Sequence, residues 1–359
     1  FAAVQKVFMN ALSILLAPVV FFSIASSFAS LSDSSEIGKL AGKTMLFFAA
    51  MTALAIMIGI GCGYLFLHGG TTPVIQSMVS DSDSVSSKNV EISLFSMLTG
   101  LVPKDIIAPL QTLNILQIFI CSVFVGCAMS ILGEKVSHLR ILCDEAKSLF
   151  SKLMGMTVSW MPLIAFAAMA TLVYKSTLLS LTLLVSYILS AVAGCFLMYC
   201  MFALTILLFS HASFIPYLKN MPSFFMTPFI CPKRNAILPV TLGFCTNKLE
   251  SSEKISAFIL SFGASIHKSA IAMCVMLQVI LFAKISGITL SSYMLFKLSL
   301  MTFFLSLGSN GLVCLMAVLP LANIPVSLIA FTMGVEDIVD RLRTVTNISG
   351  DIAATVVVR

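Results

Sequence analysis

The sequence predicts an all-α protein that crosses a membrane several times. Of its 359 residues, 59% are hydrophobic and only 10% are charged, whereas a soluble domain carries roughly 25% charged residues. The mean hydropathy is +1.06. So few charged side chains cannot cover a water-facing surface, so lipid is the expected solvent. The length allows roughly seven or eight spans of about 20 residues each.

Apolar stretches of helical length recur along the whole chain. They cover residues 7–31, 44–67, 113–132, 157–174, 178–210, 255–283, 293–331 and 332–358. This pattern places the protein in the cell (inner) membrane as a multi-pass protein in contact with lipid. The chain begins at Phe1, close to an apolar stretch, which suggests a fragment.

Two of the apolar stretches are interrupted. Residues 214–249 hold five prolines, and Gly308-Ser309-Asn310-Gly311 breaks a second stretch. Interruptions of this kind in one half of a chain indicate hairpins or broken helices at the binding site of a transporter.

Composition and spacing argue against several other classes of protein. The net charge is +6, but the basic residues lie singly in short loops, so no nucleic-acid partner is expected. No pair of the ten cysteines has CxxC spacing, so neither a zinc site nor a redox motif is indicated. No nucleophile and base show the spacing of a known catalytic motif, so an enzyme is not expected.

The last span carries an unusual polar stripe. Its members recur at steps of three or four residues: Glu336, Asp340, Arg343, Thr344, Asn347 and Asp351. That spacing puts them on one face of a helix. A charge at the bilayer centre costs about 2.5–3.5 kcal/mol on insertion scales. The stripe should therefore face protein or a water-filled cavity.

The side chains of the stripe suit distinct tasks. Asp340 can accept hydrogen bonds from an ammonium, and Arg343 offers a planar fork to a carboxylate. Thr344 is a neutral hydrogen-bonding neighbour. Asn347 and Asp351 supply hard oxygens that suit a small cation such as Na⁺. The alternative is an internal network in which Asp340 and Arg343 satisfy each other.

The stripe also resembles a known signature. Residues 340–351 read D-R-L-R-T-V-T-N-I-S-G-D. They resemble D-x-x-R-T-x-x-N-x-x-G-D, the signature of the dicarboxylate/amino acid:cation symporters, which include the glutamate transporters. Individually weak matches follow in the family's order, at residues 16–21, 37–40, 238–241 and 263–266. The resemblance covers nearly the whole chain, and only the family's first helix is missing.

The resemblance implies a homotrimeric elevator-type transporter of the glutamate-transporter-like fold, with two re-entrant hairpins and interrupted seventh and eighth helices. Residues 1–210 would supply helices two to six, which form the scaffold plus the third helix of the core. Residues 211–359 would form the transport core. Its parts would be a hairpin at 211–249, an interrupted helix at 253–283, a hairpin at 293–333 and the last helix at 334–359.

The resemblance also implies roles for the stripe. Asp340 would bind the substrate amino group and Arg343 a side-chain carboxylate. Thr344 and Asn347 would complete the substrate site, and Asn347 and Asp351 would bind sodium.

The sequence departs from the family at the opposite half of the site. The family's seventh-helix motif reads Asn-Met-Asp-Gly-Thr, and the matching positions here are His267, Lys268, Ser269, Ala270 and Ile271. Ser269 thus replaces an aspartate of a further sodium site. The third-helix positions expected at that site are Phe48, Met51 and Thr52. Too few oxygens remain for a hard cation, so this further site is predicted not to bind sodium.

Both hairpin tips are altered as well. The first has Lys233, Arg234 and Asn235 where the family has a serine run, and the second is shortened to Ser309, Asn310 and Gly311. These tip residues are therefore candidates for altered gating.

Two residues of the seventh-helix motif are candidates for altered coupling. Lys268 could replace a lost sodium, paired with Asp340 or Asp351, or titrate and permit proton coupling; alternatively it extends to water. His267 could relay protons or be an ordinary packed residue.

The predicted function is symport of acidic amino acids, such as aspartate or glutamate, or of dicarboxylates. Cation coupling would be altered, with sodium as the driving ion or a proton in place of one sodium. The alternative is a non-transporting or uncoupled homologue, either a solute sensor or an anion pathway.

Overall fold

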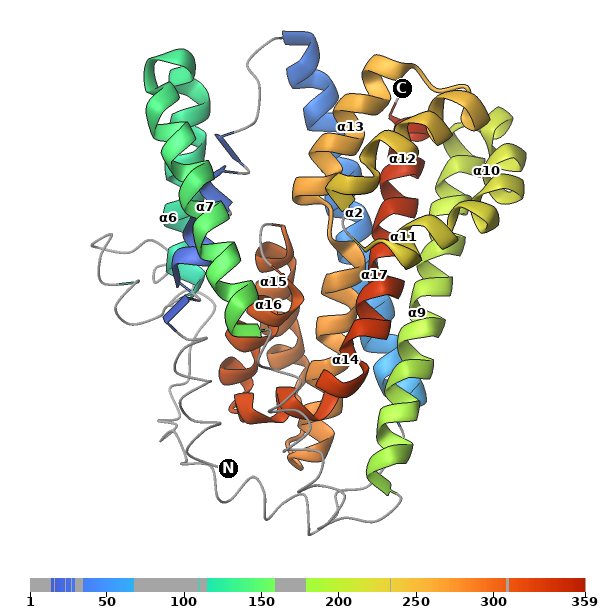
Figure 1. Cartoon of the computed structure of the whole chain (residues 1–359). Coiled ribbons are helices and arrows are strands. Elements are labelled where there is room, and N and C mark those ends of the chain that lie inside the picture. The colour runs from blue at the N-terminus through green and yellow to red at the C-terminus, as the bar shows by residue number, and fades with distance from the viewer. Residues whose placement is uncertain are drawn as a thin grey trace. The chain divides into compact units, whose positions relative to one another are not determined.

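A computed structural model describes much of the chain. The described residues are 14–15, 17–22, 24–26, 28–29, 35–67, 109, 115–158, 179–232, 234–307 and 310–358. Within them every regular element is a helix (Figure 1). This confirms the predicted all-α class. The chain divides into two compact units, each built from separate parts of the sequence.

Four helical segments within the described residues are long and apolar enough to cross a membrane. They are Lys39–Phe66, Ile120–Thr157, Thr182–Phe209 and Glu253–Ile285. Three of them coincide with the predicted stretches at 44–67, 178–210 and 255–283. The segment Ile120–Thr157 overlaps the stretch predicted at 113–132 only as far as Leu132, and its second half was not predicted as an apolar stretch. The predicted stretch at 157–174 lies outside the described residues from 159 onward, and the one at 7–31 is described only in part.

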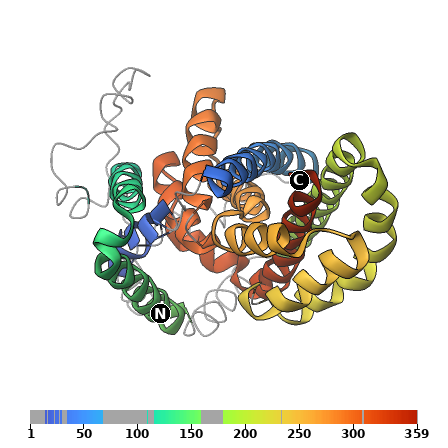
Figure 2. The same cartoon turned by 90° about the horizontal axis from the view of Figure 1, so that it is seen from above.

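The first unit comprises residues 1–34, 70–180 and 282–334. Its described helices are α6 (Ile115–Leu132), the 3₁₀ turn η1 (Gly133–Val136), α7 (Ser137–Val158), α15 (Ser292–Ser306), α16 (Gly311–Val318), η2 (Leu319–Ala322) and η3 (Val326–Leu328). α6 and α7 lie side by side in Figures 1 and 2. The chain reverses between them at Gly133, whose φ of 57° suits glycine. Arg140 donates to the carbonyl of Met129 at 3.1 Å and thereby caps the end of α6.

The second unit comprises residues 35–69, 181–281 and 335–359. Its helices are α2 (Ser35–Phe66), α9 (Leu179–Phe209), α10 (His211–Phe224), α11 (Met226–Ile230), α12 (Arg234–Leu249), α13 (Glu253–Ile266), α14 (Ser269–Ile285) and α17 (Ile329–Val357); α9, α14 and α17 belong to it as far as these ranges reach. α14 is its most buried helix, and residues 272–277 are all 0% exposed. A stretch with no exposed face must be apolar all round, as this sequence is.

Small residues let α2 approach α14 closely. A Cβ on Gly59 would lie 2.5 Å from the backbone oxygen of Met273, and one on Gly63 would lie 2.7 Å from the side chain of Ile280. Glycine at these positions is therefore a packing requirement, as is common between membrane helices.

The proline-rich segment 214–249 forms three short helices in place of one long span. Pro216 and Pro222 lie inside α10, and Pro239 lies inside α12. α11 is only five residues long and ends at the extended residue Cys231. Pro232 follows, and α12 begins at Arg234, so the chain reaches the start of α12 without a continuous helix.

Candidate functional site

The candidate site lies in the second unit, where α13 and α14 are separated by His267 and Lys268. His267 has extended backbone angles, with φ −76° and ψ 110°. The break leaves carbonyl oxygens at the end of α13 and N–H groups at the start of α14 without helical partners. The end of α13 therefore carries partial negative charge, and the start of α14 carries partial positive charge.

Most of the polar stripe on α17 is buried, as its predicted position requires. Arg343, Thr344, Asn347 and Asp351 are each at most 6% exposed. Glu336 and Asp340 are the exceptions, with 20% and 52% of their side chains exposed. The hydroxyl of Thr344 donates a hydrogen bond to the backbone oxygen of Asp340 at 2.9 Å, so its donor has a partner within α17.

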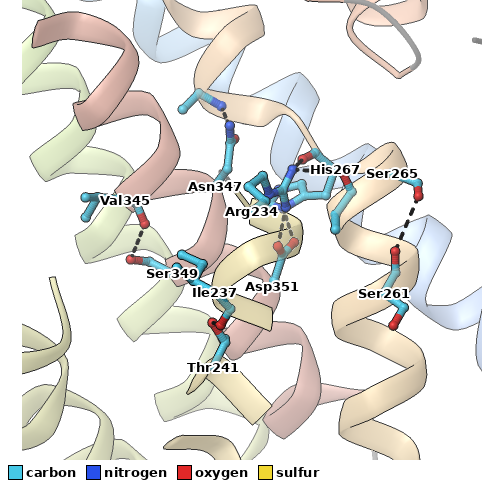
Figure 3. Close-up of polar contacts among 12 residues, drawn as sticks. Arg234, Ile237, Thr241, Ser261, Ser265, His267, Val345, Asn347, Ser349 and Asp351 are labelled. Carbon is cyan, nitrogen blue, oxygen red and sulfur yellow. Dashed lines mark hydrogen bonds and ion pairs between the residues drawn. The ribbon is translucent and has the colours of Figure 1, made fainter. Parts of the chain in front are cut away.

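Asp351, Arg234 and His267 meet at the break and form a cluster, the Asp351 cluster. Arg234 Nη2 forms an ion pair with Asp351 Oδ2. Arg234 Nη1 donates to the backbone oxygen of His267 at 2.7 Å and lies 3.5 Å from that of Ala264. His267 Nδ1 lies 2.8 Å from Asp351 Oδ1. Figure 3 shows these side chains converging from α12, the break and α17.

Asn347 lies one helical turn before Asp351 and contacts the first turn of α14, on the C-terminal side of the break. Its Oδ1 accepts a hydrogen bond from the backbone N–H of Ala270 at 2.9 Å (Figure 3). It therefore caps α14 from a neighbouring helix, which satisfies one of the four unpaired N–H groups of that helix.

The imidazole of His267 is enclosed by aromatic rings and glycines. Phe48 stacks on it with ring centroids 4.3 Å apart and an interplanar angle of 9°, and Phe202 approaches at 6.2 Å with its edge. A Cβ on Gly350 would clash with both His267 and Phe202, and one on Gly263 would clash with the Asp351 carboxylate. His267 Nε2 is buried and has no hydrogen-bond partner. These contacts favour the packed interpretation of His267 over a proton relay.

A second cluster, the Arg343 cluster, lies two turns earlier on α17. Arg343 Nη2 contacts Glu336 Oε1 and lies 3.2 Å from Asp340 Oδ1. Gln278 of α14 donates to Glu336 Oε2 at 3.3 Å. Among the described residues, no hydrogen-bond partner reaches the buried Nε and Nη1 of Arg343 or the buried hydroxyl of Tyr187. The internal pairing of Asp340 with Arg343 is thus present but uses only one nitrogen of the guanidinium.

The remaining predicted residues are placed as follows. Ser269 begins α14, and its buried hydroxyl has no partner. Lys268 lies in the break. Asn310 precedes α16 and Gly311 begins it, in the first unit. Lys233, Ser309 and the side chain of Asn235 lie outside the described residues.

Sequence reasoning gave no role to Gln278 or Tyr187. Gln278 is the one amide among the apolar residues 270–283, and that isolation was an available signal. A tyrosine in an apolar span is a weaker signal, because its ring packs well whether or not the hydroxyl is used.

Comparison with known proteins decides the family. The whole chain, residues 1–359, matches the sodium:dicarboxylate symporter family. The chain belongs to this family. The resemblance inferred from residues 340–351 is therefore confirmed. Sodium:dicarboxylate symporters are transporters and not enzymes, and the family with its apolar helices makes this chain a multi-pass membrane protein, which in bacteria lies in the inner membrane.

Three curated relatives of this chain carry the same functional description. The C4-dicarboxylate transport protein of Cupriavidus necator is 25% identical over 370 residues, covering 98% of this chain and 83% of the relative. That of Rhizobium etli is 25% identical over 376 residues, covering 98% and 81%. That of Bacillus subtilis is 24% identical over 362 residues, covering 98% and 85%.

The family's description implies sodium-coupled transport, so the oxygens predicted to bind sodium can be tested for fit. Asn347 Oδ1 accepts from Ala270, and the two oxygens of Asp351 contact His267 and Arg234. A guanidinium already balances the single negative charge of this carboxylate. In this arrangement the predicted oxygens do not fit an additional sodium ion.

Proposed function

We propose that the protein is a secondary active transporter of small dicarboxylates, with C4-dicarboxylates as its main substrates. The observation that carries the proposal is Arg343, a guanidinium buried in a membrane protein with two of its three nitrogens unpartnered. The C4 chain length comes from the names of the relatives, all C4-dicarboxylate transport proteins.

The unpartnered donors of Arg343 argue for a ligand. A buried N–H without an acceptor costs about 1–3 kcal/mol, and more in a charged group. Glu336 and Asp340 contact the guanidinium only at Nη2, so they orient it without using its other donors. A substrate carboxylate would supply the missing acceptors through charge-assisted hydrogen bonds.

A second candidate substrate is an acidic amino acid such as aspartate. Asp340 supports it, because its carboxylate is half exposed and lies next to Arg343 at 3.2 Å. The ammonium of an amino acid could bind there while its side-chain carboxylate binds Arg343, with Thr344 and Asn347 nearby on the same helix face. A dicarboxylate has no ammonium and would not need Asp340 in this role.

For the transport cycle we propose the arrangement that the resemblance implies. The hairpins at 211–249 and 293–333, the interrupted helix at 253–283 and the last helix at 334–359 would form a mobile core. The third helix would join that core, and the other helices of residues 1–210 would form a trimeric scaffold for an elevator movement. The number or kind of coupled cations would differ from that in family members that keep every sodium ligand.

The test is uptake of labelled succinate into proteoliposomes containing the purified chain. We expect concentrative uptake that unlabelled succinate inhibits at lower concentration than aspartate or glutamate does. Loss of hydrogen bonds to a charged group is worth about 1.5–3 kcal/mol, so Arg343→Ala should lower kcat/KM roughly 10- to 100-fold.

Arg341→Ala is the matched control, because Arg341 lies on the same helix but donates to the carbonyls of Phe229 and Ile230. Stronger inhibition by aspartate would favour the amino-acid candidate. Binding of succinate without uptake would contradict the proposal and favour a sensor.

A further inference from the structure

We infer that Arg234 is a built-in cation that takes the place of a sodium ion at Asp351. The family's description leads to the expectation of sodium coupling, and the sequence predicted sodium at Asn347 and Asp351. The guanidinium of Arg234 instead contacts Asp351 and the backbone oxygen of His267. The inference deepens the proposed function, because it concerns the ion dependence of that transporter.

The charge of Asp351 requires a cationic partner. The residue is 2% exposed, and a buried carboxylate is stable only when it is paired and hydrogen-bonded. Arg234 supplies one full positive charge, and His267 binds the second oxygen at 2.8 Å. A sodium ion at the same carboxylate would lie beside a guanidinium, and two like charges this close repel in a medium of low dielectric constant.

The backbone around Asp351 also offers what a small cation would use. The break after α13 directs carbonyl oxygens of Ala264 and His267 toward Arg234, at 3.5 and 2.7 Å. Carbonyl and carboxylate oxygens together are the ligand set that hard cations prefer. The negative end of α13 adds to the attraction for any positive charge there. Arg234 thus uses the oxygen atoms that would otherwise surround an ion.

The position of Arg234 in its own helix supports a specific role. Arg234 is the first residue of α12, and a positive charge at a helix N-terminus is electrostatically unfavourable. Local helix stability therefore does not explain an arginine at this position. Its contacts with α17 and with the end of α13 do.

The inference replaces a different assignment made from the sequence. The sequence left two alternatives for Lys268, as a substitute for a lost sodium paired with Asp340 or Asp351, or as a side chain that extends to water. The ion pair at Asp351 belongs to Arg234, which precedes Asp351 by 117 residues. The start of α12 thus supplies a positive charge at this carboxylate.

The test measures sodium binding by thermal unfolding of the purified full chain, so it needs no transport activity. The melting temperature Tm is compared in NaCl, KCl and choline chloride at equal ionic strength. A ligand that binds only the folded state raises Tm with its concentration. We expect wild type to show no sodium-specific rise, and Arg234→Ala to be less stable in choline and to gain a rise on the order of 3 °C in sodium.

Three further variants control the experiment. Arg234→Met combined with Asp351→Asn removes both charges and should lose the sodium response while regaining stability over Arg234→Ala. Asp351→Asn alone should show no sodium response. Arg341→Ala removes a different arginine that binds carbonyls and should behave as wild type does.

Two results would overturn the inference. One is a sodium-specific rise in Tm of wild type that Asp351→Asn abolishes, and this comparison remains informative even if Arg234→Ala fails to fold. The other is a folded Arg234→Ala protein with no sodium response. Succinate uptake is measured on the same preparations. If the Tm values respond to sodium as expected but no succinate is taken up, the inference stands and the proposed function is rejected. If succinate is taken up but wild type shows a sodium-specific rise in Tm that Asp351→Asn abolishes, the proposed function stands and the inference is rejected.

Discussion

Two arginine–carboxylate clusters lie on α17, and they differ in how completely their groups are used. In the Asp351 cluster both carboxylate oxygens and two nitrogens of Arg234 have protein partners. In the Arg343 cluster the part of the chain that the structure describes contacts the guanidinium at Nη2 alone, and Asp340 is half exposed. Among the described residues, Arg234 lacks a partner at Nε alone, whereas Arg343 lacks one at both Nε and Nη1. We call the Asp351 cluster the closed cluster and the Arg343 cluster the open cluster. An arginine beside a carboxylate of α17 therefore does not by itself identify a solute site, whereas a buried guanidinium with most of its donors unpartnered points to one.

The largest loss of stability is expected when the ion pair of the closed cluster is removed. Asp351→Ala leaves Arg234, whose side chain is 14% exposed, without its carboxylate partner, and removing one member of a largely buried ion pair costs about 3–5 kcal/mol. Unfolding by denaturant or heat measures this loss. Arg343→Ala should destabilise the fold less, because Asp340 is left 52% exposed to water and Glu336 keeps its hydrogen bond from Gln278. Equal losses for the two variants would remove the distinction between the clusters.

The next effect tests how tightly the closed cluster is packed. A Cβ on Gly350 would clash with the rings of His267 and Phe202, and overpacking typically costs about 1–3 kcal/mol. Gly350→Ala should lower Tm accordingly. Gly61→Ala is the control, because nothing lies within 4 Å of its Cβ position and alanine is preferred to glycine within helices. A neutral Gly350→Ala variant would show that the cluster can relax.

A smaller effect concerns the cap of α14, which lies between the clusters along α17. Asn347→Ala removes the acceptor for the N–H of Ala270, and loss of a cap costs about 0.5–2 kcal/mol. Hydrogen exchange of the first turn of α14 should rise while that of α13 stays unchanged. Asn347→Asp keeps an acceptor and should retain protection. Equal exchange in Asn347→Ala and wild type would contradict the capping role.

The smallest expected effect is a change in substrate affinity, which tests whether the open cluster binds the substrate. Glu336→Gln keeps a hydrogen-bonding side chain but removes one negative charge beside Arg343. The Arg343 guanidinium should then attract an anion more strongly, because less negative charge lies beside it. Its position should also be less fixed, because the ion pair with residue 336 is lost. We expect a change in KM for succinate of roughly two- to tenfold, equivalent to about 0.5–1.5 kcal/mol. An unchanged KM with unchanged kcat would argue against substrate binding at Arg343.

Much of the fold followed from the sequence because helical periodicity and hydropathy are local properties. The stripe on α17 and the spans around residues 44–67 and 178–210 were predictable in this way. The family resemblance could be recognised from residues 340–351, because few sequences combine this charge pattern with this helical period.

The pairing within the site could not be predicted from the same information. Periodicity identifies neighbours on one helix, whereas Arg234 and Asp351 meet only because the start of α12 and the end of α13 reach the same point on α17. Phe48 was recognised as a lost sodium ligand, but its stacking on His267 depends on how α2 packs beside the break. The exposure of Asp340 likewise follows from its position on α17 relative to neighbouring helices, which no local pattern describes.

The contacts of Arg234 have a mechanical consequence. One side chain joins the start of α12, the last turn of α13 and the C-terminal third of α17. Any displacement of α12 away from α17 would have to separate a buried ion pair and expose two charges to an apolar surrounding. These three segments should therefore move as one rigid body, so any opening of the site must occur along some other boundary of the molecule.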